Sequence, residues 1–122
     1  MLINLSNHAF DTWDSGQQQT AHENFGEVVD LTFPEVNPHA KTGEVAALAK
    51  NYLNQCITIL AGIDGKKNAV HITGEHCFVF LFVTLAKAEN IMCVCSTTPR
   101  IVTSHKSTKT SVFYFEKLRS YF

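Results

Sequence analysis

The stretch that most constrains the fold runs from residue 68 to residue 89. It reads Asn-Ala-Val-His-Ile-Thr-Gly-Glu and continues His-Cys-Phe-Val-Phe-Leu-Phe-Val-Thr-Leu-Ala-Lys-Ala-Glu. Val70 and Ile72 are β-branched and lie among apolar residues, which is typical of a buried strand. Gly74 stands where the chain must turn, and glycine adopts a positive φ at little cost. The stretch therefore predicts a strand, a tight turn at residues 73–75, and a helix.

The same alternation of strand and helix runs through most of the chain. Strong periodicity predicts a long helix that Thr42 caps, because apolar residues recur at i, i+3, i+4 and i+7 over four turns up to Leu60. A shorter surface helix is expected at residues 14–24, capped by Asp14 or Ser15 and ended by Gly26. Strands are expected at residues 2–5, 27–33 and 91–95, and a hairpin at residues 101–115 with its polar tip at 104–109.

This order of elements predicts an α/β fold with right-handed crossovers. We expect a Rossmann-like three-layer sandwich with a mostly parallel sheet and a C-terminal β-hairpin. A chain of 122 residues is long enough for one hydrophobic core and too short for two, so residues 1–122 are expected to form a single domain.

Charge and hydropathy exclude several classes of partner. Ten basic residues stand against eleven acidic ones, giving a net charge of −1. This balance argues against binding long nucleic acid, which needs a basic face. The longest apolar run, residues 77–83, is too short to span a bilayer, so no membrane partner is expected. The first residues carry no basic segment of a signal peptide, and we expect a cytoplasmic protein.

Neither a metal nor a cofactor is expected from the motifs. Cys93 and Cys95 lie two residues apart in an apolar strand and share a face, either as buried reduced thiols or as a metal-binding pair. No Cys-x-x-Cys or His-x-x-x-His spacing supports zinc, and no carboxylate cluster supports magnesium. Nucleotide-binding glycine motifs are also lacking.

The helix that follows Gly74 is apolar on almost every side between residues 78 and 83. One face of a sheet cannot cover such a helix. Either another element of the chain or a second subunit must cover the outer side, and we expect a homodimer.

Polar residues follow three strands that should lie side by side. In open α/β sheets, ligands bind beyond the carboxyl ends of the strands, where the strand order reverses. The segments that should face one crevice there are Ser6, Asn7 and His8 after the first strand, Thr73, Gly74 and Glu75 after the third, and Ser96, Thr97, Thr98 and Arg100 after the fourth.

Each of these residues has a structural explanation beside a functional one. The hydroxyl groups of residues 96–98 either bind phosphate or stabilise the turn after the strand. Arg100 either binds phosphate through its guanidinium or is a solvated turn residue. His8 is either an acid–base group or a surface residue, and Glu75 either binds a ribose or favours the helix N-terminus. His71, inside a strand, is expected to be packed in the core.

The layout resembles the CRISPR-associated Rossmann-like (CARF) domain, in particular its small stand-alone members. The resemblance rests on residues 2–8, on Ser-Thr-Thr-Pro-Arg at residues 96–100, and on the hairpin at residues 101–115. In that family the first and fourth strands carry the ligand-binding motifs, and the last two strands form a hairpin. The family binds cyclic oligoadenylates across a homodimer twofold axis.

The resemblance implies a ring nuclease of type III CRISPR antiviral signalling that degrades a cyclic oligoadenylate, with cyclic tetraadenylate the expected ligand. Such enzymes cleave without a metal, because a 2′-hydroxyl attacks the adjacent phosphate. In such a reaction Arg100 and the backbone of Ser96, Thr97 and Thr98 would stabilise charge on the phosphorane, and His8 would donate a proton to the leaving oxygen. Ring nucleases of the family often place a lysine or a serine beside the reacting phosphate, and these motifs contain no lysine. A non-catalytic sensor or sponge for the same ligand, and an unrelated α/β enzyme of nucleotide metabolism, stay open as alternatives.

Overall fold

The computed structural model describes residues 1–64, 67–105 and 108–122, with side chains described outside residues 100–113. The elements of the main sheet and its helices are β1 (Leu2–Ser6), η1 (Phe10–Thr12), α1 (Ser15–Phe25), β2 (Val28–Thr32), α2 (Thr42–Leu60), β3 (Ala69–Ile72), α3 (His76–Ala88), β4 (Met92–Thr97) and β7 (Lys117–Ser120). The remaining strands, β5 (Arg100–His105) and β6 (Thr108–Phe113), form a separate hairpin.

The five strands of the main sheet have the order β2-β1-β3-β4-β7. The first four are parallel, and β7 joins β4 in the antiparallel sense. The strand order reverses beside β1, because β2 lies on one side of it and β3 on the other. The expected Rossmann-like α/β fold, with a mostly parallel sheet and a C-terminal hairpin, is confirmed.

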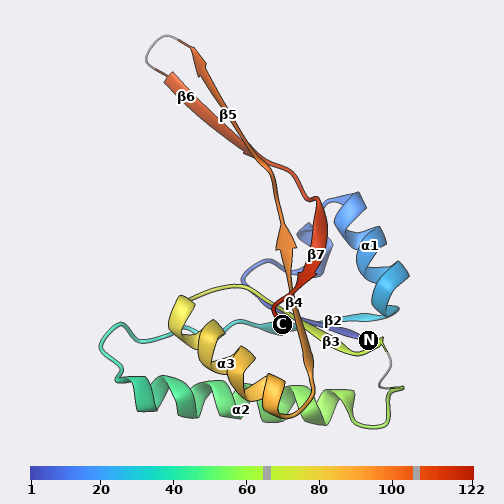
Figure 1. The fold of residues 1–122 in the computed structure, drawn as a ribbon, viewed down its shortest axis with the longest axis vertical. Helices are drawn as coiled ribbons and strands as arrows, with labels where there is room; N and C mark the ends of the chain where they lie inside the picture. The colour runs from blue at the N-terminus through green and yellow to red at the C-terminus, as the bar shows by residue number, and fades with distance from the viewer. Residues whose placement is uncertain (65–66, 106–107) are drawn as a thin grey trace.

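Side chains of β1 alternate between two hydrophobic clusters, as the period of a strand requires. Leu2 packs with Trp13 and Ala21 on the side of α1. Ile3 and Leu5 face the larger cluster that α2 and α3 cover. The sheet is thus the middle layer, with α1 on one face and the two longer helices on the other (Figure 1). Asn4 and Ser6 share the α1 side with Leu2 and point toward the functional region described below.

The helix starts follow the expected capping chemistry in part. Asp14 caps α1, since its carboxylate accepts a hydrogen bond from the backbone N–H of Gln17 at 2.7 Å, and Gly26 ends the helix with φ of 80°. The prediction that Thr42 caps α2 is wrong. Thr42 is the first helical residue, and Lys41 takes the cap position with an extended backbone, its N–H bonded to the Glu44 carboxylate.

One strand prediction near the C-terminus needs correction, and one strand was not predicted. The fourth strand continues through Thr97 instead of stopping at residue 95, because β7 supplies a hydrogen-bonding partner as far as the pair Thr97 and Lys117. No pattern in the sequence indicated β7 itself. It is a short edge strand with mostly exposed side chains, and such strands carry little hydrophobic pattern.

The β5–β6 hairpin projects from the sheet where β4 ends (Figure 1). Its pairs run from Arg100 opposite Phe113 to His105 opposite Thr108, so the strands reach into the segment expected to form the polar tip. Residues 106–107, the centre of that expected tip, lie outside the described part of the chain.

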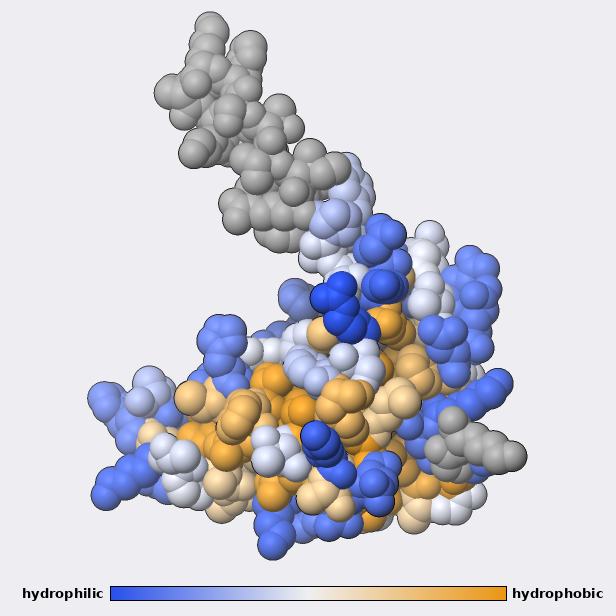
Figure 2. All heavy atoms as spheres, in the orientation of Figure 1, coloured by the Kyte–Doolittle hydropathy of each residue, from blue (hydrophilic) through white to orange (hydrophobic). Residues whose placement is uncertain are grey.

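One face of α3 is covered within the chain, and another is not. Phe78, Phe82 and Ala86 are fully buried, and the rings of Tyr52 on α2 and Phe78 meet edge to face at 5.8 Å. Phe80, on the outer side, is 70% exposed. Hydrophobic residues, coloured orange, gather on the face of the molecule that Figure 2 shows. Intramolecular packing therefore covers only part of this apolar helix, and the expected second subunit stays a prediction.

Across the described residues, no helix combines the length and the hydropathy that a membrane span requires.

Candidate functional site

A cavity of about 300 Å³ opens at the carboxyl ends of β1, β3 and β4. Its position beside the reversal of strand order is the place where open α/β sheets bind ligands. Every lining residue except Trp13 carries a hydroxyl, imidazole, amide or carboxylate group in its side chain. The lining residues are Ser6, His8, Thr12, Trp13, Asp14, Gln17, His71, Thr73 and Ser96.

Asn4 organises the polar side chains beneath the cavity. It lies on the central strand β1, is 1% exposed, and stands in register between Asp30 on β2 and His71 on β3. Its amide nitrogen donates to the Asp30 carboxylate and to the carbonyl oxygen of His8, both at 2.8 Å. Its amide oxygen accepts from the Ser6 hydroxyl at 2.7 Å. A buried amide with this many partners fixes the loop that carries His8.

His71 connects this amide to the cavity. Its Nδ1 lies 3.1 Å from the Asn4 oxygen, and its Nε2 lies 2.9 Å from Ser96 Oγ. Trp13 covers the imidazole, with ring centroids 4.8 Å apart. Burial lowers the pKa of His71 to about 4, so the ring is neutral at physiological pH. The expectation of a packed core histidine is confirmed, and this one also reaches the site through Ser96.

The segment between β1 and α1 forms the outer wall. The Trp13 indole N–H donates to the carbonyl oxygen of His8 at 3.1 Å, and the Asp30 carboxylate accepts from the backbone N–H of Phe10. From the first turn of α1, the Gln17 amide donates to Ser96 Oγ at 2.9 Å. These contacts tie the loop after β1 to the sheet and place His8 at the rim, where its side chain is exposed.

The structure brings four of the predicted site residues to this one cavity. Ser6 and His8 come from the end of β1, Thr73 from the end of β3, and Ser96 from β4. Ser96 lies inside the strand instead of after it, and its hydroxyl is shared between His71 and Gln17. Residues from all three expected strand ends therefore face the same space.

Other predicted residues lie beside the cavity and not in its wall. Asn7 lines a smaller hollow of about 150 Å³ with Asn4, Ser6 and Asp30. Glu75 is exposed and caps α3, because its carboxylate accepts from the backbone N–H groups of Cys77 and Phe78. Those bonds lower the pKa of Glu75. This geometry matches the structural explanation given for Glu75.

The other residues predicted at the end of β4 lie outside the wall of the cavity, each in a different place. The Thr97 hydroxyl donates to the carbonyl oxygen of Lys117 and accepts from its N–H, both at 3.2 Å, so it fastens β4 to β7. Thr98 is exposed in the link to the hairpin. Arg100 begins β5, and its side chain lies outside the described part of the structure.

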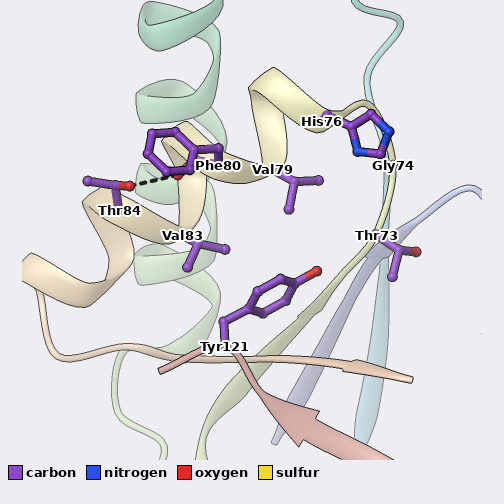
Figure 3. A pocket seen from close by; sticks show the side chains of 8 residues that line it. All are labelled: Thr73, Gly74, His76, Val79, Phe80, Val83, Thr84 and Tyr121. Carbon is purple, nitrogen blue, oxygen red and sulfur yellow. Dashed lines mark hydrogen bonds between the residues drawn. The ribbon is translucent and has the colours of Figure 1, made fainter. Parts of the chain in front are cut away.

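A second, wider groove of about 520 Å³ adjoins the cavity at Thr73. Figure 3 shows its lining from α3 and from the segment after β3, together with Tyr121, which follows β7. The Tyr121 hydroxyl donates to the carbonyl oxygen of Ile72 at 2.6 Å and so holds the C-terminus against β3. The wall on the α3 side is mostly apolar, with Val79, Phe80 and Val83 lying between His76 and Thr84.

Gly74 lies in this groove, and the positive φ expected for it is confirmed, at 159°. A Cβ at this position would collide with the ring of Phe33. The close approach of that ring to the backbone is a second reason for glycine at residue 74.

Sequence reasoning missed Asn4, Gln17 and Trp13 as parts of the site, and it assigned His71 to the core alone. A signal was present, since Asn4 and His71 are polar residues inside otherwise apolar strands. Buried polar side chains need partners, so two of them on neighbouring strands suggest a shared network. The register that pairs them was not readable from the sequence.

No group of three or more His, Cys, Asp or Glu side chains suited to a metal ion occurs in the described residues. Cys56 and Cys93 are buried free thiols, and burial raises the pKa of each to about 12.

Residues 1–119 match the family described as the Uncharacterized protein MJ1673 family, and the chain belongs to that family. Comparisons with curated proteins and with solved structures give no significant match.

Proposed function

We propose that this member of the MJ1673 family binds a cyclic oligoadenylate, such as cyclic tetraadenylate, and cleaves it as a metal-independent ring nuclease. The proposal takes its ligand from the resemblance of the sequence to small CARF proteins. The observation that supports it is the polar cavity at the carboxyl ends of β1, β3 and β4, lined by Ser6, His8 and Ser96. Phosphate and ribose groups are bound by hydroxyl, imidazole and amide groups of this kind.

The size of the cavity supports a dimeric site. A volume of about 300 Å³ is at the lower end of the range for small-molecule pockets. A ring of several nucleotides exceeds it, and two copies related by a twofold axis would provide two such cavities. The exposed Phe80 and the apolar side of the adjoining groove offer a surface on which the second copy could pack.

Cleavage in this site would depend on how the site positions the reacting atoms of the ring. The 2′-oxygen, the phosphorus and the leaving 5′-oxygen must be brought into line, and holding them so lowers the barrier strongly. His8 at the rim would donate a proton to the leaving oxygen. Arg100, which follows the cavity strand by three residues, would stabilise charge on the phosphorane. The products would be linear adenylates that end in a 2′,3′-cyclic phosphate.

Binding and cleavage are tested in sequence with the purified chain. Calorimetric titration with cyclic tetraadenylate, and with linear tetraadenylate and ATP as controls, measures affinity and ring selectivity. Single-turnover cleavage of labelled ring in EDTA then measures chemistry, and the proposal expects linear products in EDTA. Binding without cleavage would indicate a sensor or sponge. Failure to bind any cyclic oligoadenylate would contradict the proposal and favour an enzyme of nucleotide metabolism.

A further inference from the structure

The hydrogen bonds around Asn4 determine which nitrogen of His71 carries the proton. The amide nitrogen of Asn4 donates to two oxygens, those of His8 and Asp30, so the amide oxygen is the atom that faces His71. An amide oxygen only accepts hydrogen bonds. His71 Nδ1 must therefore be the protonated nitrogen, and Nε2 presents a lone pair to Ser96.

The hydroxyl of Ser96 is then oriented on both sides. Its proton points at His71 Nε2, which is 2.9 Å away, and its oxygen accepts from the Gln17 amide, also at 2.9 Å. A hydroxyl oxygen accepts two hydrogen bonds, so one acceptor position remains for a donor in the cavity. Both ring nitrogens of His71 are occupied, and a hydroxyl group in the cavity reaches the imidazole through Ser96.

We propose that His71 is the proton acceptor of the cleavage step, and that it acts through the hydroxyl of Ser96. This inference rests on the proposed function. The attacking 2′-hydroxyl gives its proton to Ser96 Oγ, Ser96 gives its own proton to His71 Nε2, and the 2′-oxygen bonds to phosphorus. The bond from phosphorus to the 5′-oxygen breaks, and that oxygen takes the proton of His8. Exchange with water after product release returns both histidines to their starting states.

The surroundings of His71 keep the ring in its neutral form. Its pKa of about 4 keeps the ring unprotonated from mildly acidic pH upward. Asn4 Oδ1 accepts from Nδ1 in both charge states and so holds the ring in place while the charge changes. The titratable groups around it are Asp30 behind Asn4, His8 at the rim, and Asp14 at the start of α1.

The test uses single-turnover cleavage of labelled cyclic tetraadenylate by His71→Gln, Ser96→Ala and the double variant. Glutamine can still accept from Ser96, but it cannot take up a proton. Each single variant is expected to lose at least about 100-fold in rate, with affinity for the ring changed less than about threefold. The double variant is expected to be no slower than either single variant, because the two residues act as one relay. His39→Gln, at an exposed histidine, is the matched control and keeps the wild-type rate.

The pH dependence separates proton transfer from a purely structural role. Since His71 protonates near pH 4, the wild-type rate should not fall as pH is lowered from 7 to about 5. Imidazole added to His71→Ala should restore part of the rate, and it should not do so when Ser96 is also alanine. Circular dichroism and ring binding verify that each variant is folded.

The outcomes distinguish the two proposals. Wild-type protein that binds the ring without cutting it overturns the cleavage and the relay together. A His71→Gln variant that cleaves at the wild-type rate overturns the relay and leaves the proposed function intact. A tenfold loss per pH unit below about 6.5 that persists in His71→Gln would also overturn the relay, because the titrating base would then be another group.

Discussion

At the scale of single residues, Asn4 is the group on which the polar interior of the sheet depends. All of its hydrogen-bonding capacity is used, by Asp30, His8, Ser6 and His71. In the described part of the chain, no buried side-chain nitrogen or oxygen lacks a partner. A network that is complete in this way is rigid, and removing one member leaves several others unpaired.

The buried histidine should make stability depend on pH. His71 has a pKa of about 4 in the folded protein and 6.5 as its ordinary value, so the unfolded chain binds the extra proton between these pH values. The free energy of unfolding should therefore be highest above pH 6.5 and should fall by up to roughly 3 kcal/mol toward pH 4. Urea unfolding of wild type and His71→Gln at several pH values measures this. An identical pH dependence in both proteins would contradict the assignment.

His8 is the exposed histidine of the cavity and the proposed proton donor. Its backbone carbonyl holds the network, but its side chain makes none of those bonds. His8→Ala should therefore leave the fold intact and slow cleavage at least about 100-fold, with little change in ring affinity. Single-turnover rates and calorimetry measure the two quantities. Loss of binding would make His8 a ligand contact instead, and no change in either would remove it from the mechanism.

At the scale of elements, the Phe33 ring packs against the backbone of Gly74 and so shapes the connection from β3 to α3. Phe33, which follows β2, contacts both Gly74 and Phe78, and the ring centroids of Phe33 and Phe78 are 4.9 Å apart. Gly74→Ala would force the Phe33 ring to move within a packed core. We expect a loss of about 1–3 kcal/mol in the free energy of unfolding. Denaturant unfolding measures it, and Gly43→Ala, at a site with open space around the Cβ, is the control.

The long helix α2 could be predicted from its apolar periodicity, the central strands from their apolar residues, and α1 from its local caps. Asp14 and Gly26 bound α1 as their side-chain and backbone chemistry requires. The edge strand β7 could not be predicted, because Lys117–Ser120 is short and mostly exposed, and only pairing with β4 makes it a strand. For the same reason the end of β4 was misplaced by two residues.

The candidate site was predictable in its location and less so in its contacts. Ser6, Thr73 and Ser96 follow or end strands that topology brings together, and the order of elements was enough to show this. The link from Asn4 through His71 to Ser96 depends on register between strands distant in sequence. Gln17 depends on how α1 packs, which no local pattern specifies.

At the scale of the whole molecule, the surface around Phe80 is where a second copy is expected. Phe80→Glu should shift the protein to the monomer and weaken ring binding together, because a charged side chain cannot be buried there without a partner. Sedimentation velocity at micromolar concentration measures the first effect, and calorimetry the second. Ile57→Glu, at an exposed apolar residue of α2, is the matched control. A wild-type monomer that binds the ring tightly would contradict the dimer.

The pairing of β4 with β7 has a consequence for the hairpin between them. Thr97 and Lys117 are hydrogen bonded to each other, so the sheet is already closed at the base of residues 100–113. The β5–β6 hairpin is thus inserted between two strands that pair with each other without its help. Replacing residues 99–115 by a short Asn-Gly turn should keep the melting temperature within a few degrees of wild type, as calorimetry can measure. The length of the β5–β6 hairpin could then vary, and with it the partners that the hairpin contacts, while the five-stranded sheet stays the same.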